Sequence, residues 1–447
     1  AVYLSYRLVL ILKLGEGTAL IASLLLTLTP WHIHLSRGGY EANLALTLGL
    51  ASVYYLLKSR FTRSALYLAL AAYTYYTSKM FTPLLLMLVW LWSHWGQQVK
   101  VWVKPFVRYW SVALVFALPA LYLAFFAGGQ VRFQNINIFV DKTIIPRVER
   151  GRNFFDNPKS TLAKLTENRA TYHLQDFVTY YFDNFSGQFL FVGGDSNLRY
   201  GLANHGMLYL IDAPLILLGI FLLYKKKQKA WRLLIAWLLL APIPTALVGP
   251  AYGLRSLAML PVPQIFAGYA LVQIFLWSKT SGFRKLLFTA LLLAYSLSFA
   301  NWTLRYVYQY PSYGRYWYDS TMFEAIEYAR EREDQYDHFI ITQSYGETSM
   351  YFAYYNQVDP RDYRKAKDNR LMIDGVPMIK LGKYYFGDIR PQGPIEQMDL
   401  PDNTLLIVQP LFEYGEQDII ARDDGRVIFR TFGFPTVHMQ ADNLENQ

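Results

Sequence analysis

Long apolar runs follow one another through the first two thirds of the chain, and short polar connections separate them. Each run is apolar on every face, which is typical of membrane helices and not of the amphipathic helices of a soluble bundle. The complete runs cover residues 17–35, 41–57, 64–78, 81–95, 108–127, 206–224, 231–249, 256–277 and 285–303. This region is therefore predicted to be an all-α polytopic membrane domain.

A further apolar stretch opens the chain. Residues 1–13, AVYLSYRLVLILK, have the character of half a membrane helix. At about 1.5 Å per residue they are too short to cross a hydrocarbon core of ~30 Å. With this stretch, about ten helices are expected. We also expect the chain to be an N-terminally truncated piece of a longer protein.

Every second connection between the runs is basic. The positive-inside rule places such connections in the cytoplasm. The basic groups are Lys58, Arg60 and Arg63; Lys100, Lys104 and Arg108; Lys225, Lys226, Lys227, Lys229 and Arg232; and Lys279, Arg284 and Lys285. The intervening connections are then extracytoplasmic, including the long loop 128–205 and everything after residue 303. The sequence thus predicts a multi-pass protein of the inner or plasma membrane.

The two long extracytoplasmic segments differ in character. Loop 128–205 is too long for a plain connector. Within it, residues 159–182 predict a helix along the membrane surface, and Gly193-Gly194-Asp195 predicts a tight turn. Residues 304–447 have a soluble composition, in which strands alternate with helices. We expect a membrane domain at 1–303 and a small extracytoplasmic α/β domain at 304–447.

Elements of the second domain can be placed individually. Helices are expected at 322–333 and 347–356, and strands at 338–342, near 404–409 and near 427–431. The domain has no glycine-rich nucleotide motif and no metal-ligand spacing, so no chemistry is assigned to it.

Composition adds three constraints. Hydrophobic residues make up 53% of the 447 residues and aromatic residues 17%, which fits a membrane protein with interfacial Trp and Tyr. The net charge of +10 resides largely in short loops, so a nucleic-acid partner is not expected. The chain has no cysteine, which excludes disulfides, cysteine metal sites and a thiol nucleophile.

The densest polar cluster lies between the first two complete runs, in PWHIHLSRGGYEANL. A helix that begins near Gly39 would hold Glu41 in its first turn, where the helix dipole favours a carboxylate. Arg37 could face Glu41 across that turn, and the alternative is a structural ion pair that closes a helix hairpin. His32 and His34 lack further ligands, so interfacial packing is preferred to a metal site.

Cations recur at the extracytoplasmic ends of the runs: Arg37, Lys79, Arg199 and Arg255. Each could simply extend to the interface. Together they suit an anionic ligand at the depth of the headgroups, such as a lipid-linked phosphate. Substrate contacts are assigned to His34, Tyr40, Asp195 and Arg199, and His173 and Asp176 are weaker candidates.

Several segments in collinear order resemble the superfamily of protein O-mannosyltransferases and lipid A aminoarabinose transferases, membrane glycosyltransferases with the GT-C fold. They are LTLTPWHIHLSRGGYEANLALTLGL, AAYTYYTSKMFTPLLLML, QFLFVGGDSNLRYG with LYLIDAPLILLGI, and LLLAPIPTALVGPAYGLRSLAMLPV. The resemblance covers about residues 1–275. It implies a polyprenyl-phosphate sugar donor, transfer to an external acceptor with inversion, and an outward soluble domain.

The resemblance also implies roles for single residues. The family's arginine and the acid four residues later correspond to Arg37 and Glu41, its basic residue after the fifth helix to Lys79, and its later arginine to Arg255. Arg37, Lys79 and Arg255 would bind the donor phosphate, and Glu41 a sugar, the acceptor or a divalent cation. No other cofactor is expected.

One part of the family pattern has no counterpart. The main catalytic acid of the family lies in the first outer loop, which would precede residue 1. We therefore expect the acid upstream and the present chain to be inactive alone. The alternatives to a glycosyltransferase are a transporter or lipid flippase, and a non-catalytic membrane scaffold.

Overall fold

The structure is a computed structural model that describes residues 1–126, 137–141, 143–279, 281–318, 320–343, 347–388, 400–401, 403–408, 419–421 and 427–431. The chain divides into two compact units, Ala1–Tyr310 and Pro311–Gln447. The domain division expected after residue 303 falls instead within a continuing helical segment. That segment runs from α16 (Gly282–Leu304) through η4 (Arg305–Gln309) into α17 (Tyr310–Trp317).

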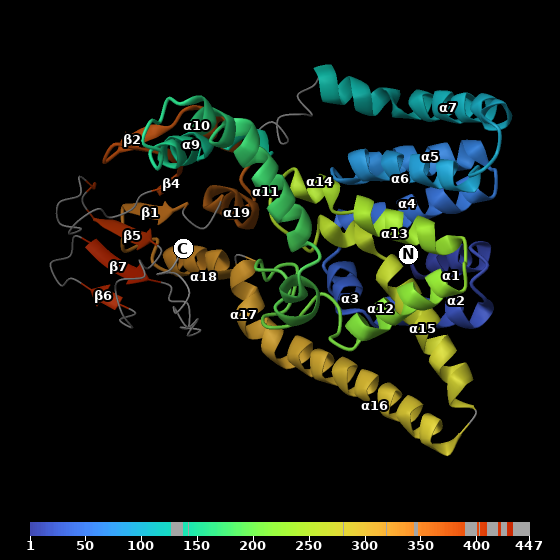
Figure 1. Cartoon of the computed structure of the whole chain (residues 1–447). Coiled ribbons are helices and arrows are strands. Elements are labelled where there is room, and N and C mark those ends of the chain that lie inside the picture. The colour runs from blue at the N-terminus through green and yellow to red at the C-terminus, as the bar shows by residue number, and fades with distance from the viewer. Residues whose placement is uncertain are drawn as a thin grey trace. The chain divides into compact units, whose positions relative to one another are not determined.

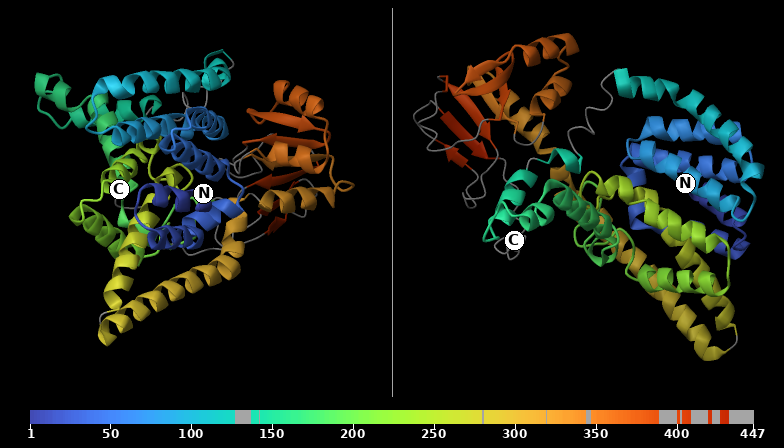
Figure 2. Two further views of the ribbon diagram at one scale, coloured as in Figure 1. Left: turned by 90° about the vertical axis from the view of Figure 1, so that its right-hand side faces the viewer. Right: turned by 45° about the horizontal axis from the view of Figure 1, so that its top comes forward.

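The first unit is a helical bundle, in which α4 to α7 run side by side and α15 passes through the interior (Figures 1 and 2). Besides α16, its long helices are α1 (Val2–Ile11), α2 (Glu16–Leu28), α3 (Pro30–Arg37), α4 (Glu41–Leu57), α5 (Phe61–Thr74), α6 (Ser78–Ser93), α7 (Val99–Phe126), α12 (Asp212–Lys225), α13 (Ala230–Leu240) and α15 (Val262–Ser278). Two short helices, α14 (Ile243–Ala246) and η3 (Ser256–Met259), lie between α13 and α15.

Helix α15 is central because its neighbours approach its backbone closely. A Cβ atom on Gly219 of α12 would lie 2.0 Å from the carbonyl oxygen of Phe266. A Cβ atom on Gly268 would lie 2.8 Å from the backbone nitrogen of Ala22 in α2. Small residues at helix crossings are the usual means of close packing between apolar helices. Every residue of α15 from Val262 to Leu271 is buried as a result.

Three helices among the described residues are long and apolar enough to cross a membrane: Val99–Pro119, Ser256–Ser278 and Gly282–Gly314. The bent pair α2 and α3 would make a fourth. Large apolar side chains are exposed on these and other helices, among them Leu118, Leu217 and Leu293. An exposed apolar surface of this extent indicates association with a membrane.

Several expected spans are broken. The run 17–35 bends by 56° between α2 and α3, because Pro30 starts a new helix after Thr29. Prolines 242 and 244 likewise divide the run 231–249 into α13 and α14. Residues 206–211 precede α12 as a loop that is buried over 206–209, where Leu208 donates a backbone hydrogen bond to Leu190 at 2.8 Å. Apolar composition alone does not distinguish these segments from continuous helices.

The segment between α7 and α12 carries η1 (Ile138–Val140), α9 (Ile144–Arg152), α10 (Thr161–Thr166), α11 (Arg169–Asp183) and the π-helical η2 (Gln188–Val192). The single helix expected at 159–182 is therefore wrong. The side chain of Asn168 accepts a hydrogen bond from the backbone of Thr171 and starts a second helix.

The second unit contains a sheet in the order β2-β3-β4-β1-β5-β7-β6, whose central pairs are parallel. The strands are β1 (His338–Thr342), β2 (Leu371–Ile373), β3 (Val376–Leu381), β4 (Tyr384–Gly387), β5 (Thr404–Val408), β6 (Ile419–Ala421) and β7 (Val427–Thr431). Helices α18 (Ser320–Arg330), α19 (Thr348–Tyr355) and α20 (Pro360–Asp368) share one core with one face of the sheet. The elements expected at 322–333, 338–342, 347–356, 404–409 and 427–431 are confirmed, with shifts at their ends.

Candidate functional site

Five tyrosines gather at the end of the bundle where α4 and α6 begin. We call Tyr40, Tyr200, Tyr252, Tyr306 and Tyr310 the tyrosine cluster. They come from four separate segments: the α3–α4 turn, the loop after η2, the loop before η3, and the η4–α17 helix. The predicted site residues lie among them.

His34 lies on one side of this cluster. It is 3% exposed, and its Nε2 atom lies 2.9 Å from the backbone oxygen of Arg199. Its ring meets the rings of Tyr306 and Tyr310 edge-on, with centroid distances of 5.6 and 5.1 Å. Tyr310 in turn donates a hydrogen bond of 2.9 Å to the oxygen of Leu198. The histidine therefore packs within the cluster.

A second set of contacts runs from α4 to Arg255. The Tyr40 hydroxyl also donates to the backbone oxygen of Arg199, at 3.1 Å. Its ring lies 5.2 Å from that of Tyr200, which lies 4.7 Å from that of Tyr252. The guanidinium of Arg255 lies over the ring of Tyr252, 4.5 Å from its centroid. This arrangement fixes the direction of the arginine through aromatic contacts.

Asp195 joins two of the loops that carry the cluster. One carboxylate oxygen accepts a hydrogen bond from the backbone of Gly253, and the other accepts one of 2.8 Å from the backbone of Asn197. The side chain of Asn197 accepts from the backbone of Arg199 at 3.0 Å. Burial raises the pKa of Asp195 to about 6, although these hydrogen bonds and nearby Arg255 act against the rise. Asp195 therefore joins the loop that carries Tyr200 to the loop that carries Tyr252.

The loop that holds Arg255 is also tied to α3. The indole nitrogen of Trp31 donates a hydrogen bond of 2.7 Å to the backbone oxygen of Gly253. Trp31 is 1% exposed, so this bond is made in the interior of the bundle. A buried bond of this kind limits the movement of the loop, because breaking it would leave polar groups without partners.

Arg255 lies beside a narrow apolar cavity between α4 and α6. Its volume of about 20 Å³ has room for about one water molecule. Its walls are Ala42, Ala45, Leu46, Gly49 and Leu50 of α4; Tyr75 and Thr77; Ser78, Phe81, Thr82 and Leu85 of α6; Trp237 of α13; and Leu254, Arg255, Leu257 and Ala258. Arg255 is the charged residue of this lining.

Lys79 belongs to the first turn of α6, next to Ser78 in the cavity wall. Its ammonium group lies 5.4 Å from the centre of the Tyr76 ring. Lys79 and Arg255 are thus carried by segments that border one cavity. Lys79 itself is not part of the cavity lining.

The structure does not bring Arg37 and Glu41 together. Helix α3 ends at Arg37, the chain leaves the right-handed helical conformation at Gly39, whose φ is 66°, and α4 begins at Glu41. The Arg37 guanidinium lies instead over the ring of Tyr306, at 5.0 Å. No ion pair joins the two side chains in the described part of the chain. Glu41 does occupy the first turn of α4, as predicted.

Among the described residues, no group of three or more His, Asp or Glu side chains could hold a metal ion. The weaker candidates His173 and Asp176 lie in α11, where Asp176 pairs with Arg147.

Sequence reasoning missed Tyr200, Tyr252, Tyr306 and Tyr310. A local signal existed for two of them, because LRYG and YGLR both place a tyrosine close to an arginine. Tyr306 and Tyr310 follow a long apolar run and carried no such signal. Tyr306 lies in the π-helical segment η4 and Tyr310 begins α17, and the rings of both contact His34.

No known protein family, no curated protein and no solved structure matches the chain.

Proposed function

We propose that the first unit is a GT-C-type membrane glycosyltransferase, which transfers a sugar from a polyprenyl phosphate to an external acceptor with inversion. The observation that carries this proposal is the placement of Arg255 at an apolar cavity, beside the turn that carries Lys79. A lipid phosphate has a charged group, which suits the arginine, and a hydrocarbon chain, which suits the apolar walls of the cavity. The resemblance of the collinear segments to such enzymes supports the same conclusion.

The proposal includes a membrane topology of about ten helices. The four basic connections lie in the cytoplasm, and the tyrosine cluster lies at the extracytoplasmic end. Broken helices such as α2–α3 and α13–α14 are compatible with this topology. Non-helical backbone is tolerated at membrane depth where it is buried within protein.

In the reaction, the bond between the anomeric carbon and the phosphate oxygen breaks, and the polyprenyl phosphate leaves with the electron pair. An acceptor oxygen or nitrogen attacks the opposite face of that carbon and gives its proton to a carboxylate base. Arg255 and Lys79 stabilise the negative charge on the leaving phosphate. Glu41 lies exposed at the start of α4 and is the candidate for contacting a sugar or the acceptor.

The role of Arg255 can be tested directly. Its guanidinium contacts the Tyr252 ring and makes no hydrogen bond or ion pair with another side chain of the described residues, so its donors are available to a phosphate. The chain in lipid nanodiscs should bind undecaprenyl phosphate at least 10-fold more tightly than undecaprenol, the matching alcohol. Arg255→Ala should remove most of this difference.

Arg63→Ala is the matched control, because Arg63 also lies over a tyrosine ring, Tyr55, at 5.8 Å. It should leave the preference for phosphate unchanged. Equal affinity of the wild-type chain for phosphate and alcohol would contradict the proposal.

A second experiment addresses transfer. Incubation of the full-length protein, which would carry the acid expected upstream, with a radiolabelled polyprenyl-phosphate sugar and membrane extract should release polyprenyl phosphate and label an acceptor. Movement of the intact lipid between leaflets of vesicles, without cleavage, would instead identify a flippase and contradict a transferase.

A further inference from the structure

A second pocket lies away from the tyrosine cluster, within the segment between α7 and α12. It has a volume of about 310 Å³, which is within the range of small-molecule sites. Besides Gly151, its lining consists of Arg147, Arg150, Phe154, Phe155, Glu167 and Tyr172. We call it the Arg147 pocket. None of its residues takes part in the function proposed above.

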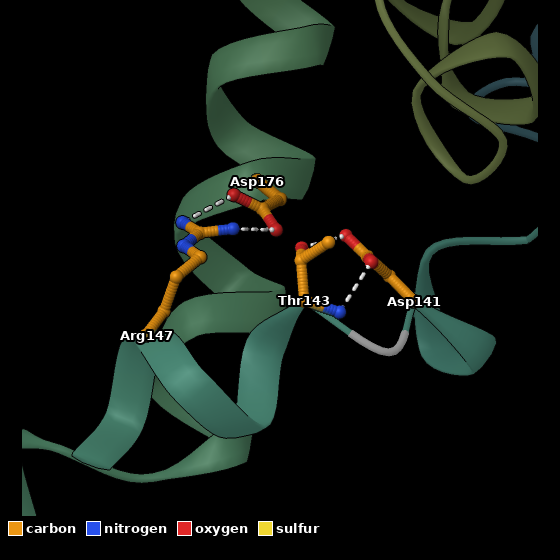
Figure 3. A network of polar contacts seen from close by, with 4 residues as sticks. All are labelled: Asp141, Thr143, Arg147 and Asp176. Carbon is orange, nitrogen blue, oxygen red and sulfur yellow. Dashed lines mark hydrogen bonds and ion pairs between the residues drawn. The ribbon is translucent and has the colours of Figure 1, made fainter. Parts of the chain in front are cut away.

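The walls of the pocket are held in place by polar contacts. Both terminal nitrogens of Arg147 donate hydrogen bonds of 2.9 Å to the carboxylate oxygens of Asp176, across α9 and α11 (Figure 3). The same guanidinium lies over the Tyr172 ring, at 4.8 Å. Before α9, Asp141 accepts hydrogen bonds from the backbone and the hydroxyl of Thr143 (Figure 3). Arg147 is therefore a structural member of the wall.

A carboxylate is also fixed in the lining of the pocket. The Tyr172 hydroxyl donates a hydrogen bond of 2.6 Å to Glu167, and Arg152 holds the Glu167 backbone oxygen at 2.8 Å. Gly151 makes this arrangement possible. A Cβ atom there would lie 2.1 Å from one Glu167 oxygen and 2.6 Å from the Tyr172 hydroxyl. The second carboxylate oxygen remains able to accept hydrogen bonds from a ligand.

Two further side chains have unused binding capacity. The Arg150 side chain has no hydrogen bond or ion pair within the described residues. Phe154 is 86% exposed, which is costly for a large aromatic ring with no partner. The pocket thus presents a free cation, a free carboxylate oxygen and an open aromatic face.

We propose that the Arg147 pocket binds an acidic saccharide. The negative substituent would lie on Arg150, because a guanidinium binds carboxylate, sulfate or phosphate groups in its plane. Sugar hydroxyls would donate hydrogen bonds to the Glu167 carboxylate. Because this carboxylate is negative, it would repel a ligand made only of anionic groups. The ring's C–H face, which is slightly positive, would lie on Phe154. The saccharide bound there would be the acceptor of the transferase, and this part of the inference rests on the function proposed above.

Titration calorimetry of the purified chain in detergent tests the proposal, with trigalacturonate, a sulfated disaccharide and neutral maltotriose as probes. We expect at least one acidic saccharide to bind 10-fold or more tightly than maltotriose. Arg150→Ala and Phe154→Ala should each weaken this binding about 10-fold or more. Since the Arg150 side chain makes no polar contact within the described residues, the substitution should leave hydrogen exchange of α9 and α11 unchanged.

Arg169→Ala is the matched control, because this exposed arginine at the start of α11 lies outside the pocket lining. It should change the affinity less than 2-fold. Equal losses in Arg150→Ala and Arg169→Ala, or no binding of either acidic probe, would overturn the proposal. So would a Phe154→Ala variant that loses binding to anionic lipid vesicles while it keeps saccharide affinity.

The outcome can be separated from that of the proposed transferase. The probes contain no lipid phosphate, so Arg255→Ala should bind them like the wild-type chain. Arg150→Ala should in turn retain its preference for undecaprenyl phosphate over undecaprenol.

Discussion

The tyrosine cluster and the Arg147 pocket use arginine in different ways. In the cluster, Arg37 and Arg255 lie over tyrosine rings, and no carboxylate among the described residues pairs with them. In the pocket, Arg147 also lies over a tyrosine ring, but Asp176 binds both of its terminal nitrogens.

The difference shows which arginines can serve a ligand. A ring contact orients the guanidinium and leaves its N–H donors available. A bidentate carboxylate pair uses the donors to hold two helices together. We therefore assign ligand binding to Arg255 in the cluster and to Arg150 in the pocket, and a structural role to Arg147.

The largest effect concerns Asp195, which holds the cluster together while buried. Its pKa is raised from 3.8 to about 6, so the folded state retains the proton more strongly than the unfolded state. The stability that this proton contributes is complete below about pH 4 and is lost as the pH rises through about 6. The expected loss is roughly 3 kcal/mol, at 1.36 kcal/mol for each pKa unit.

Unfolding by urea at several values between pH 4 and pH 7.5 measures this effect, with Asp195→Asn as the reference. The free energy of unfolding of the wild-type chain should fall relative to that of the variant as the pH rises. A constant difference across this range would show that Asp195 is not titrating in the folded state.

The next effect concerns the pair between Arg147 and Asp176. Their side chains are 34% and 11% exposed, so the pair is only partly screened by solvent. Asp176→Ala should destabilise the packing of α9 on α11 by about 2 kcal/mol. This cost lies between those of breaking a solvent-exposed ion pair and a buried one. Hydrogen exchange of α9 amides measures the change. A similar rise in exchange in Arg150→Ala would contradict the separate roles of the two arginines.

A smaller effect is expected at Tyr40. Tyr40→Phe removes the hydrogen bond of 3.1 Å to the backbone oxygen of Arg199 and should cost about 1 kcal/mol in the free energy of unfolding. Tyr181→Phe removes a comparable bond to Leu239 at an exposed position and should cost less. The reverse order would show that the cluster contributes little to the stability of the bundle end.

The smallest effect concerns the ring beneath Arg255. Tyr252→Leu removes a cation–π contact of 4.5 Å, which contributes about 0.5–1 kcal/mol, and should weaken binding of undecaprenyl phosphate about 2- to 5-fold. Tyr55→Leu, which removes the ring beneath Arg63, should leave that binding unchanged. If both variants bind like the wild-type chain, Tyr252 does not direct Arg255 towards the ligand.

Periodicity predicted much of the fold. Helix α4 begins and ends where the apolar run 41–57 does, and strand β1 spans the expected 338–342. Such elements follow from local sequence, because apolar spacing and flanking polar residues determine them. Elements broken by proline, such as α2–α3 and α13–α14, were predicted as single helices. The apolar pattern continues across the break even though the backbone does not.

The candidate site was predicted less completely. The cation positions Lys79 and Arg255 were found from sequence because charges beside apolar runs are conspicuous. The proposed pair between Arg37 and Glu41 assumed one continuous turn, whereas the chain changes direction at Gly38 and Gly39. The free Arg150 and the paired Arg147 lie three residues apart on α9 and could not be distinguished by sequence.

By itself, the sequence determined the apolar helical character of the first unit, the alternation of helices and strands in the second, and the residue types available for a phosphate. The tertiary structure alone decided which tyrosine lies beneath which arginine, that Asp195 bridges two loops, and that Arg147 is paired while Arg150 is free. The physical reason is distance along the chain. Apolar periodicity is a local property, whereas a contact such as that of His34 with Tyr306 joins segments whose approach depends on the packing of the whole bundle.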